Sequence, residues 1–264
     1  GLAASCVAGD AGLASAAPAA SVPFQLGMAS YTLRQFTLDQ ALEMTKRLGL
    51  TRIAFKDFHL KLDATPDVIA DTLAKVKAAG LELYGGGGIY MKSEAEVDRA
   101  FEYVKAAGMR IMIGVPTYEL LDYTSKKAQQ YDIRVAIHNH GPDNPLFPTP
   151  QSAYERIVKL DRRLGLCVDV GHTQRSGVDP SESIEKYIDR VYDVHIKDVS
   201  APTAKGQTVE IGRGVIDIPK LLRTLRKVGF AGTLALEYEK DAKDPLPGAA
   251  ESIGYLRGVI ATMA

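Results

Sequence analysis

Short apolar runs alternate with longer amphipathic stretches along most of the chain. Residues 26–31 form such a run, and residues 37–49 place hydrophobic positions at helical spacing, with Thr37 suited to cap the helix and Gly49 to end it. The same pair of elements then recurs. Further strands are predicted over residues 52–57, 81–84, 110–115, 134–138, 164–169, 191–197 and 232–237. Further helices are predicted over residues 66–79, 93–107, 118–131, 149–161, 180–189, 218–228 and 248–263.

Eight strand-then-helix units in one chain predict an α/β fold, a closed (β/α)8 TIM barrel. An open doubly wound sheet is the alternative, but no G-x-G-x-x-G follows the first strand. The length of 264 residues suits a single domain, which we expect to cover residues 23–264. Four glycines, residues 85–88, follow the third strand without the Lys-Ser/Thr of a phosphate loop, so we interpret them as a flexible loop at the rim.

Residues 1–22 differ from the rest, being rich in Ala, Gly and Ser without hydrophobic periodicity. This composition predicts a flexible tail that forms no packed core. The alanine run near residues 16–20 suggests the remnant of an export signal, and hence a periplasmic location. A linker without targeting meaning, in a cytoplasmic protein, is the alternative. No run approaches the roughly 18 apolar residues of a membrane-spanning helix.

The charge of the chain is balanced, with 32 basic and 32 acidic residues. This balance lacks the basic excess of a nucleic-acid-binding protein, so we expect no nucleic-acid partner. The two cysteines, Cys6 and Cys167, lie in very different contexts, the first in the tail and the second in a predicted strand. We therefore expect neither a disulfide framework nor a cysteine-based metal site.

Polar side chains gather where the last four predicted strands end. In a TIM barrel the catalytic groups come from several strands at this carboxyl end. The residues concerned are His138, His140, Asp169, His172, His195, Lys197, Asp198, Glu237 and Glu239. Burying each alone would be costly, and one divalent cation, Mn²⁺, Co²⁺, Zn²⁺ or Fe²⁺, would satisfy such a mixed set of nitrogen and oxygen ligands. A rim of solvated ion pairs is the alternative interpretation.

Four segments carry a resemblance to a known family. They are VDVGH at 168–172, VHIKD at 194–198, IGRGVID at 211–217 and LE at 236–237. Together they resemble the xylose-isomerase-like barrels, the superfamily of sugar phosphate isomerases and epimerases, with inosose dehydratase and endonuclease IV among its members. The resemblance implies that Asp169, His195 and Glu237 bind the metal. It further implies that His172 contacts the substrate or supports the metal ligands, and that Arg213 lies near the substrate. For Arg213 a solvated loop charge is an equal alternative.

One position departs from the pattern of the family. Its isomerases and epimerases usually carry a glutamate at the end of the fifth strand, which shares proton transfer with the glutamate of the eighth. Here His138 stands at that place. We expect His138, with His140 as the alternative, to complete the metal ligands. Glu237 remains as one acid/base group, and a histidine or a lysine would be the other.

The candidates for this second acid/base group are His138, His172, Lys56 and Lys197. For both lysines, a solvated charge at the rim is the alternative. We expect His140, His172 and Arg213 to contact the substrate. Five aromatic residues could line a sugar pocket or belong to the core: Tyr31, Phe55, Tyr84, Tyr90 and Phe147.

The sequence thus predicts a metal-dependent enzyme of carbohydrate metabolism that moves a proton next to a carbonyl, like a sugar isomerase or epimerase. The close alternative is a lyase or dehydratase that eliminates a β leaving group from a keto-sugar or keto-glycoside. Two other classes remain: an endonuclease IV-like phosphodiesterase, disfavoured by the charge, and a non-catalytic sugar-binding barrel. The expected partner is a small sugar or keto-sugar.

Overall fold

The computed structural model describes residues 22–263, and the predicted tail, apart from Val22, lies outside the described residues. Eight parallel strands close into a barrel in the order β1-β10-β7-β6-β5-β4-β3-β2. These strands are β1 (Gln25–Ala29), β2 (Arg52–Phe55), β3 (Glu82–Met91), β4 (Ile111–Pro116), β5 (Arg134–His138), β6 (Leu164–Asp169), β7 (Val191–Ile196) and β10 (Thr233–Leu236). The predicted (β/α)8 TIM barrel is confirmed.

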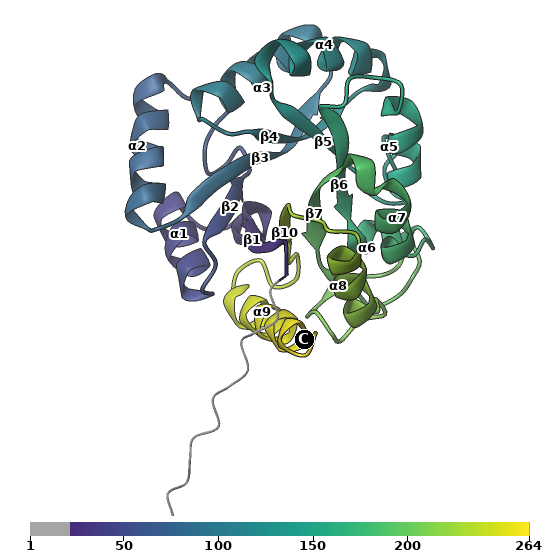
Figure 1. Cartoon of the computed structure of the whole chain (residues 1–264). Helices are drawn as coiled ribbons and strands as arrows, with labels where there is room; N and C mark the ends of the chain where they lie inside the picture. Colours follow the sequence, from purple (N-terminus) through teal and green to yellow (C-terminus); the bar gives the residue numbers. More distant parts are fainter. Residues whose placement is uncertain (1–21, 264) are drawn as a thin grey trace, which may run out of the picture.

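The helices surround the strands in a ring (Figure 1). The eight that follow the barrel strands are α1 (Leu38–Arg47), α2 (Pro66–Ala78), α3 (Glu94–Ala106), α4 (Leu121–Tyr131), α5 (Pro150–Ile157), α7 (Pro180–Tyr187), α8 (Ile218–Lys227) and α9 (Leu246–Ala261). Short 3₁₀ turns cover Ser30–Leu33 (η1), Tyr118–Leu120 (η2) and Ile188–Arg190 (η3). No helix in the described part of the chain is both long and apolar enough to span a membrane.

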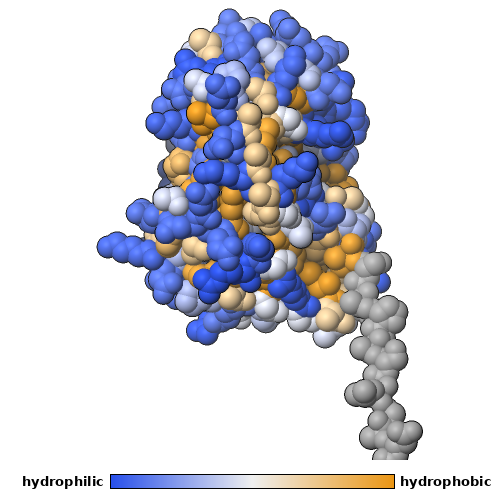
Figure 2. All heavy atoms as spheres, turned by 90° about the vertical axis from the view of Figure 1, so that its left-hand side faces the viewer, coloured by the Kyte–Doolittle hydropathy of each residue, from blue (hydrophilic) through white to orange (hydrophobic). Residues whose placement is uncertain are grey.

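Local sequence signals explain where the helices begin and end. Thr37 caps α1 as predicted, because its side chain accepts a hydrogen bond from the Gln40 amide and the Gln40 side chain accepts one from the Thr37 amide. Gly49 and Gly80 follow α1 and α2 with φ of 66° and 73°, a conformation that glycine adopts without strain. The face on the α1 and α2 side is largely hydrophilic, with hydrophobic residues visible in the gaps (Figure 2).

The third strand corrects the interpretation of the four glycines as a rim loop. β3 continues through them to Met91. A Cβ atom on Gly85 would lie 2.8 Å from the Ile111 side chain of β4, so this close approach of the two strands requires glycine. The pairing with β4 shifts register between Gly86 and Ile89, and Gly88 has a φ of 67°. The glycines therefore form an irregular stretch of strand, which brings backbone rather than side chains to the barrel mouth.

The carboxyl end of the barrel carries three short elements that the hydrophobic pattern did not predict. They are helix α6 (Val170–Arg175), directly after β6, and the two-stranded hairpin of β8 (Asp198–Val199) and β9 (Thr208–Val209). All three lie within or beside segments that carry the family resemblance.

Asp198 holds the loop after β7 in place. Its buried carboxylate accepts hydrogen bonds from the backbone amides of four residues, at 2.9 to 3.2 Å: Val199, Gly212, Gly214 and Ile216. A Cβ on Gly214 would lie 2.1 Å from this carboxylate, so glycine is needed there. The segment at 211–217 is therefore folded around Asp198, and four amides satisfy the buried charge.

Candidate functional site

Four side chains from four neighbouring strands converge inside the carboxyl end of the barrel. His138 ends β5, Asp169 ends β6, His195 lies near the end of β7, and Glu237 follows β10. Each offers one ligand atom, and these four atoms all lie within 4.8 Å of one another. All four residues are at most 9% exposed. The structure thus brings together the four predicted metal ligands.

The distances within this cluster are short. His138 Nε2 lies 3.1 Å from His195 Nδ1, 3.4 Å from Asp169 Oδ2 and 3.9 Å from Glu237 Oε2. His195 Nδ1 lies 3.2 Å from the same Glu237 oxygen. The two imidazoles and the two carboxylates therefore point at a common centre.

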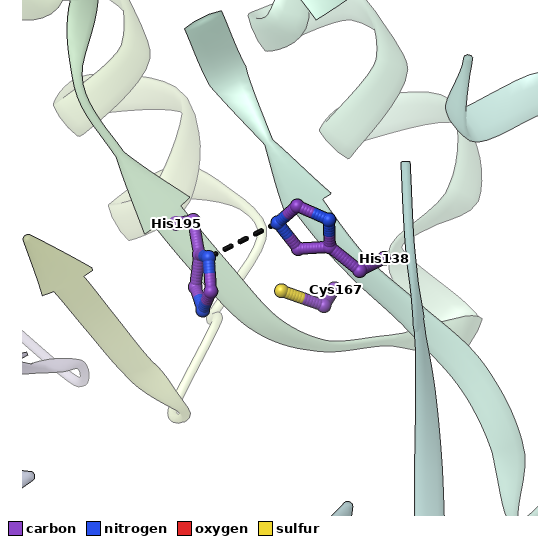
Figure 3. A group of neighbouring side chains, drawn as sticks. All are labelled: His138, Cys167 and His195. Carbon is purple, nitrogen blue, oxygen red and sulfur yellow. Dashed lines mark hydrogen bonds between the residues drawn. The ribbon is translucent and has the colours of Figure 1, made fainter. Parts of the chain in front are cut away.

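The strand alternation explains this convergence. Residues two apart on a strand share a face, so the residues that precede the four ligands by two positions form the layer beneath them. Those residues are Ala136, Cys167, Asp193 and Ala235, all fully buried. Cys167 and the two histidines form a second group of possible metal ligands, and the Cys167 sulfur lies beside the two rings (Figure 3). However, burial raises the pKa of this thiol, which keeps it protonated and opposes ligation.

Lys197 is buried next to the cluster and joins three carboxylates. Its ammonium lies 2.9 Å from Asp169 Oδ2 and 2.7 Å from Glu237 Oε2, and it also donates a hydrogen bond to Glu239. The three carboxylates leave an excess of negative charge over this single ammonium, which a divalent cation would neutralise. Lys197 is therefore a buried, paired charge, which overturns its interpretation as a solvated charge at the rim.

Burial and neighbouring charges shift the pKa values in opposite directions across the cluster. Burial lowers the pKa of His138 to about 4, so this ring is neutral at pH 7. At His195 burial also favours the neutral ring, but Glu237 and Asp193 outweigh it and raise the pKa to about 9. Burial opposes ionisation of Glu237, yet Lys197 and His195 hold its pKa well below the usual range.

The surroundings of Asp169 indicate that the cluster fits a divalent metal. The nearest cation to Asp169 Oδ2 is the Lys197 ammonium, at 2.9 Å, and this ammonium is shared with Glu237 and Glu239. An ion at the centre would add the positive charge that one shared ammonium does not supply to these buried carboxylates. Two imidazoles and two carboxylates suit Zn²⁺, Mn²⁺, Fe²⁺ or Co²⁺.

Asn139 holds Asp169 in position. Its side-chain oxygen accepts a hydrogen bond from the Asp169 amide at 2.9 Å, and its side-chain nitrogen donates to Thr173 at 3.1 Å. Asp169 in turn caps α6 by accepting from the His172 amide at 2.8 Å. The sequence placed Asn139 on the face opposite His138 and His140, and no signal indicated this supporting role.

Three further predicted residues surround the cluster. His140 lies above His138, with 4.4 Å between ring centroids, and its Nε2 is 2.9 Å from the Tyr90 hydroxyl. The His172 ring lies 6.0 Å from the His140 ring. Across the mouth, Lys56 donates a hydrogen bond to the carbonyl of Gly88, and burial lowers the pKa of this lysine.

These groups line a pocket of about 260 Å³ that opens at the barrel mouth. His138, His140, His172, His195, Glu237 and Glu239 form one side. Ala29, Ser30, Tyr31, Ala54, Lys56, Gly87, Gly88 and Tyr90 form the other. The sequence indicated neither Ser30 nor the glycines as pocket residues, because small side chains at a strand end carry no chemical signal.

Other candidates lie elsewhere. Arg213 does not line this pocket: its side chain is 64% exposed and pairs with Glu251 of α9 at 2.8 Å. This position corrects the expectation of a substrate contact and favours the solvated loop charge. Phe55, Tyr84 and Phe147 are buried outside the pocket lining, whereas Tyr31 and Tyr90 belong to it.

Comparisons with known proteins agree with this architecture. The inosose dehydratase of Histophilus somni (strain 129Pt) is 29% identical over 155 residues, which cover 51% of this chain and 51% of that protein. The chain thus spans about half the length of this curated relative.

Two solved structures share the fold. A zinc-bound structure of the IOLI protein superposes with a TM-score of 0.75 at 18% identity, covering 91% of this chain and 99% of that one. The apo 3-keto-D-glucoside 4-epimerase YcjR of E. coli gives 0.72 at 16% identity, covering 89% and 99%. At these identities the likeness shows the fold alone. The model of one family, described as xylose isomerase-like TIM barrel, matches residues 42–259, and the chain therefore belongs to the xylose isomerase-like TIM barrel family.

Proposed function

We propose that this protein is a metal-dependent enzyme that moves a proton next to the carbonyl of a sugar or keto-sugar. One observation carries the proposal: four buried ligand atoms, from two imidazoles and two carboxylates, converge at the barrel mouth. A pocket lined by histidines and glutamates opens directly onto this cluster. Perturbed titratable groups in a cleft are typical of catalytic sites.

Each residue has a distinct part in this proposal. His138, Asp169, His195 and Glu237 hold the metal, which when bound polarises the carbonyl of the substrate. Glu237 is also placed to take the proton from the neighbouring carbon. The second acid/base group comes from the histidines that face the pocket, His140 or His172.

Lys197 has a positioning role. Its ammonium lies within 3 Å of carboxylate oxygens of both Asp169 and Glu237, and it donates to Glu239, so it fixes the direction of these groups. Because Lys197 is only 2% exposed, it is screened from the bulk of the pocket. Lys56, by contrast, lines the pocket on the opposite side, where it contacts the substrate.

His138 favours elimination over simple isomerisation. A glutamate at the end of the fifth strand would give two similar carboxylates for reversible proton transfer, and the imidazole in its place leaves an asymmetric pair. Such a site suits removal of a proton by Glu237 and relay of that proton through a histidine to the β leaving group. Burial lowers the pKa of His140 to about 3, so this ring is neutral at pH 7 and must first accept the proton that it passes on. The printed names of similar proteins support both outcomes, a dehydratase and an epimerase.

The test is turnover of 3-keto-glucosides in heavy water by the metal-loaded protein. We expect release of the β substituent with loss of the hydrogen next to the ketone, and deuterium at that carbon in the substrate that is recovered. Chelation should abolish both, and His195→Ala should too. Full turnover by the metal-stripped protein would overturn the proposal. Deuterium uptake without release of the substituent would assign the epimerase reaction instead.

A count of bound metal separates this proposal from an endonuclease-like phosphodiesterase. Such an enzyme needs a cluster of about two to three metals, whereas the ligand groups found within residues 22–263 share one centre. We expect one tightly held ion per chain by elemental analysis. Tight sugar binding without metal or turnover would instead indicate a non-catalytic barrel.

A further inference from the structure

A second compartment adjoins the reactive pocket. It has a volume of about 510 Å³ and shares His172 and Glu239 with that pocket. The hairpin β8–β9 forms one wall, through Gln207 and Thr208, and Arg175 of α6 forms another. The reactive pocket alone is below the roughly 300–1,000 Å³ typical of small-molecule sites, whereas the two spaces together fall within that range.

The compartment is held in shape by hydrogen bonds. Arg175 donates to Asp143 and, at 2.8 Å, to the carbonyl of Ala204, and its Nη1 lies 3.3 Å from His172 Nδ1. The hydrogen bond from the Ser200 amide to the Gln207 carbonyl, at 2.9 Å, continues the pairing of the hairpin towards its loop. These contacts connect the compartment directly to a residue of the reactive pocket.

Arg175 lines the compartment, and one nitrogen of its side chain lacks a partner. Arg175 Nε is buried and makes no hydrogen bond to any of the described residues. Gln207, Thr208 and Ser200 add an amide and two hydroxyls to the lining. The compartment therefore offers several neutral or paired hydrogen-bond groups, the kind that recognise the hydroxyls of a sugar.

The positive charges around the compartment are already neutralised. Arg175 pairs with Asp143, and Lys240 pairs with Glu210 at 2.8 Å. Lys197 faces three carboxylates, as described above. Little net positive charge is left for a phosphate, so the compartment suits an uncharged group rich in hydroxyls.

We propose that the compartment binds a second sugar ring, so that the substrate is a keto-disaccharide or a similar glycoside rather than a free monosaccharide or a sugar phosphate. The inference rests on the proposed function for the identity of the first ring. The reacting ring occupies the pocket above Glu237, and the glycosidic link passes between His172 and Glu239, the two residues that both spaces share.

The test measures binding of unreactive probes to the metal-loaded protein by calorimetry. The probes are trehalose, methyl α-glucoside and glucose 6-phosphate, which lack the ketone. We expect trehalose to bind at least tenfold more tightly than methyl α-glucoside. Gln207→Trp, which fills the compartment from a solvent-exposed position, should reduce this preference about tenfold. The matched control is Gln151→Trp on α5, exposed and outside the pocket linings, which should keep the wild-type preference.

The outcomes separate this inference from the proposed function. Equal affinities for trehalose and methyl α-glucoside, or a preference that survives Gln207→Trp, would overturn the second-ring site. Tighter binding of glucose 6-phosphate than of either glucoside would overturn it as well, in favour of an anion site. A trehalose preference that Gln207→Trp removes supports the site even when the keto-glucosides are not turned over, a result that counts only against the proposed reaction.

Discussion

The two sides of the pocket are made from different kinds of residue. The side that β5, β6, β7 and β10 build carries imidazoles, carboxylates and the buried Lys197. The side that β1, β2 and β3 build carries small residues, backbone and the two tyrosines Tyr31 and Tyr90, with Lys56 as its only ionisable group besides them. Charge is thus concentrated on one half of the barrel mouth.

This difference indicates a division of labour. Groups that hold a metal and move a proton must lie within hydrogen-bond reach of one another, which adjacent strands provide. The rings of Tyr31 and Tyr90 on the opposite side can hold a sugar ring by stacking and leave the reaction chemistry unaffected. Substitutions on the first side should therefore change catalysis or stability, and substitutions on the second should change substrate affinity.

The largest effect is expected from Glu237→Gln on the charged side. The amide keeps the shape of the side chain but cannot take a proton, so kcat should fall by about 100- to 10,000-fold. Steady-state rates with the 3-keto-glucoside substrates, at matched metal content, give the measurement. A fall in affinity alone, with kcat retained, would show that Glu237 only binds.

Lys197→Met should reduce stability more than any other change on this side. The variant leaves the carboxylates of Asp169 and Glu237 buried without their ammonium, a loss of about 3–5 kcal/mol in the free energy of unfolding of the metal-free protein.

Added divalent metal should stabilise the variant more than the wild type at the same metal concentration. Carboxylates that have lost their ammonium attract the ion more strongly, and tighter binding to the folded state gives a larger stabilisation. Urea unfolding with and without Mn²⁺ or Zn²⁺ checks both effects. Equal stabilisation of wild type and variant by metal would show that the ion does not bind at these carboxylates.

Tyr31→Ala on the opposite side should raise KM about tenfold with little change in kcat. The variant removes the stacking surface, which is worth about 1 kcal/mol or more beyond its buried area. Tyr31→Phe keeps the ring and serves as the matched control, so its KM should stay near that of the wild type. A fall in kcat for Tyr31→Ala would contradict the division between the two sides.

Tyr90→Phe should have the smallest effect. It tests whether Tyr90 belongs to the substrate-binding side of the pocket or to the catalytic side. It removes only the hydroxyl that lies 2.9 Å from His140 Nε2, while the ring remains at the pocket wall. A neutral hydrogen bond of this kind contributes about 1 kcal/mol, so kcat/KM should fall by about five-fold. A loss as large as that of Glu237→Gln would move Tyr90 to the catalytic side.

The fold could be predicted because its signals are periodic. Alternating apolar runs and helical repeats recur along the whole chain, and parallel strands must gather their carboxyl ends at one edge. For that reason the polar residues at the ends of the last four barrel strands could be predicted to lie together. The choice of Asp169, His195 and Glu237 among them as metal ligands came from the family resemblance.

The features that the sequence did not predict depend on contacts that follow no repeating pattern along the chain. The glycines of β3 have low strand propensity, and on that basis they were interpreted as a loop. The close approach of the Ile111 side chain on the neighbouring strand requires glycine at position 85 of the strand. Arg213 was expected near the substrate from the family resemblance, whereas the loop directs its side chain towards Glu251. The network around Lys197 depends on side-chain directions at three strand ends, which a linear pattern does not specify.

The hydrogen bonds of Asp198 show that one part of the sequence specifies the scaffold, whereas another part specifies the chemistry. Its carboxylate accepts hydrogen bonds from backbone amides of the segment at 211–217, in which Gly214 makes room for it, so that segment describes how the barrel mouth is built. Sequence searches that depend on this segment will find proteins that share a scaffold, whatever reaction they perform. To classify relatives by chemistry, position 138 is more informative, because an imidazole or a carboxylate there decides which acid/base pair the site contains.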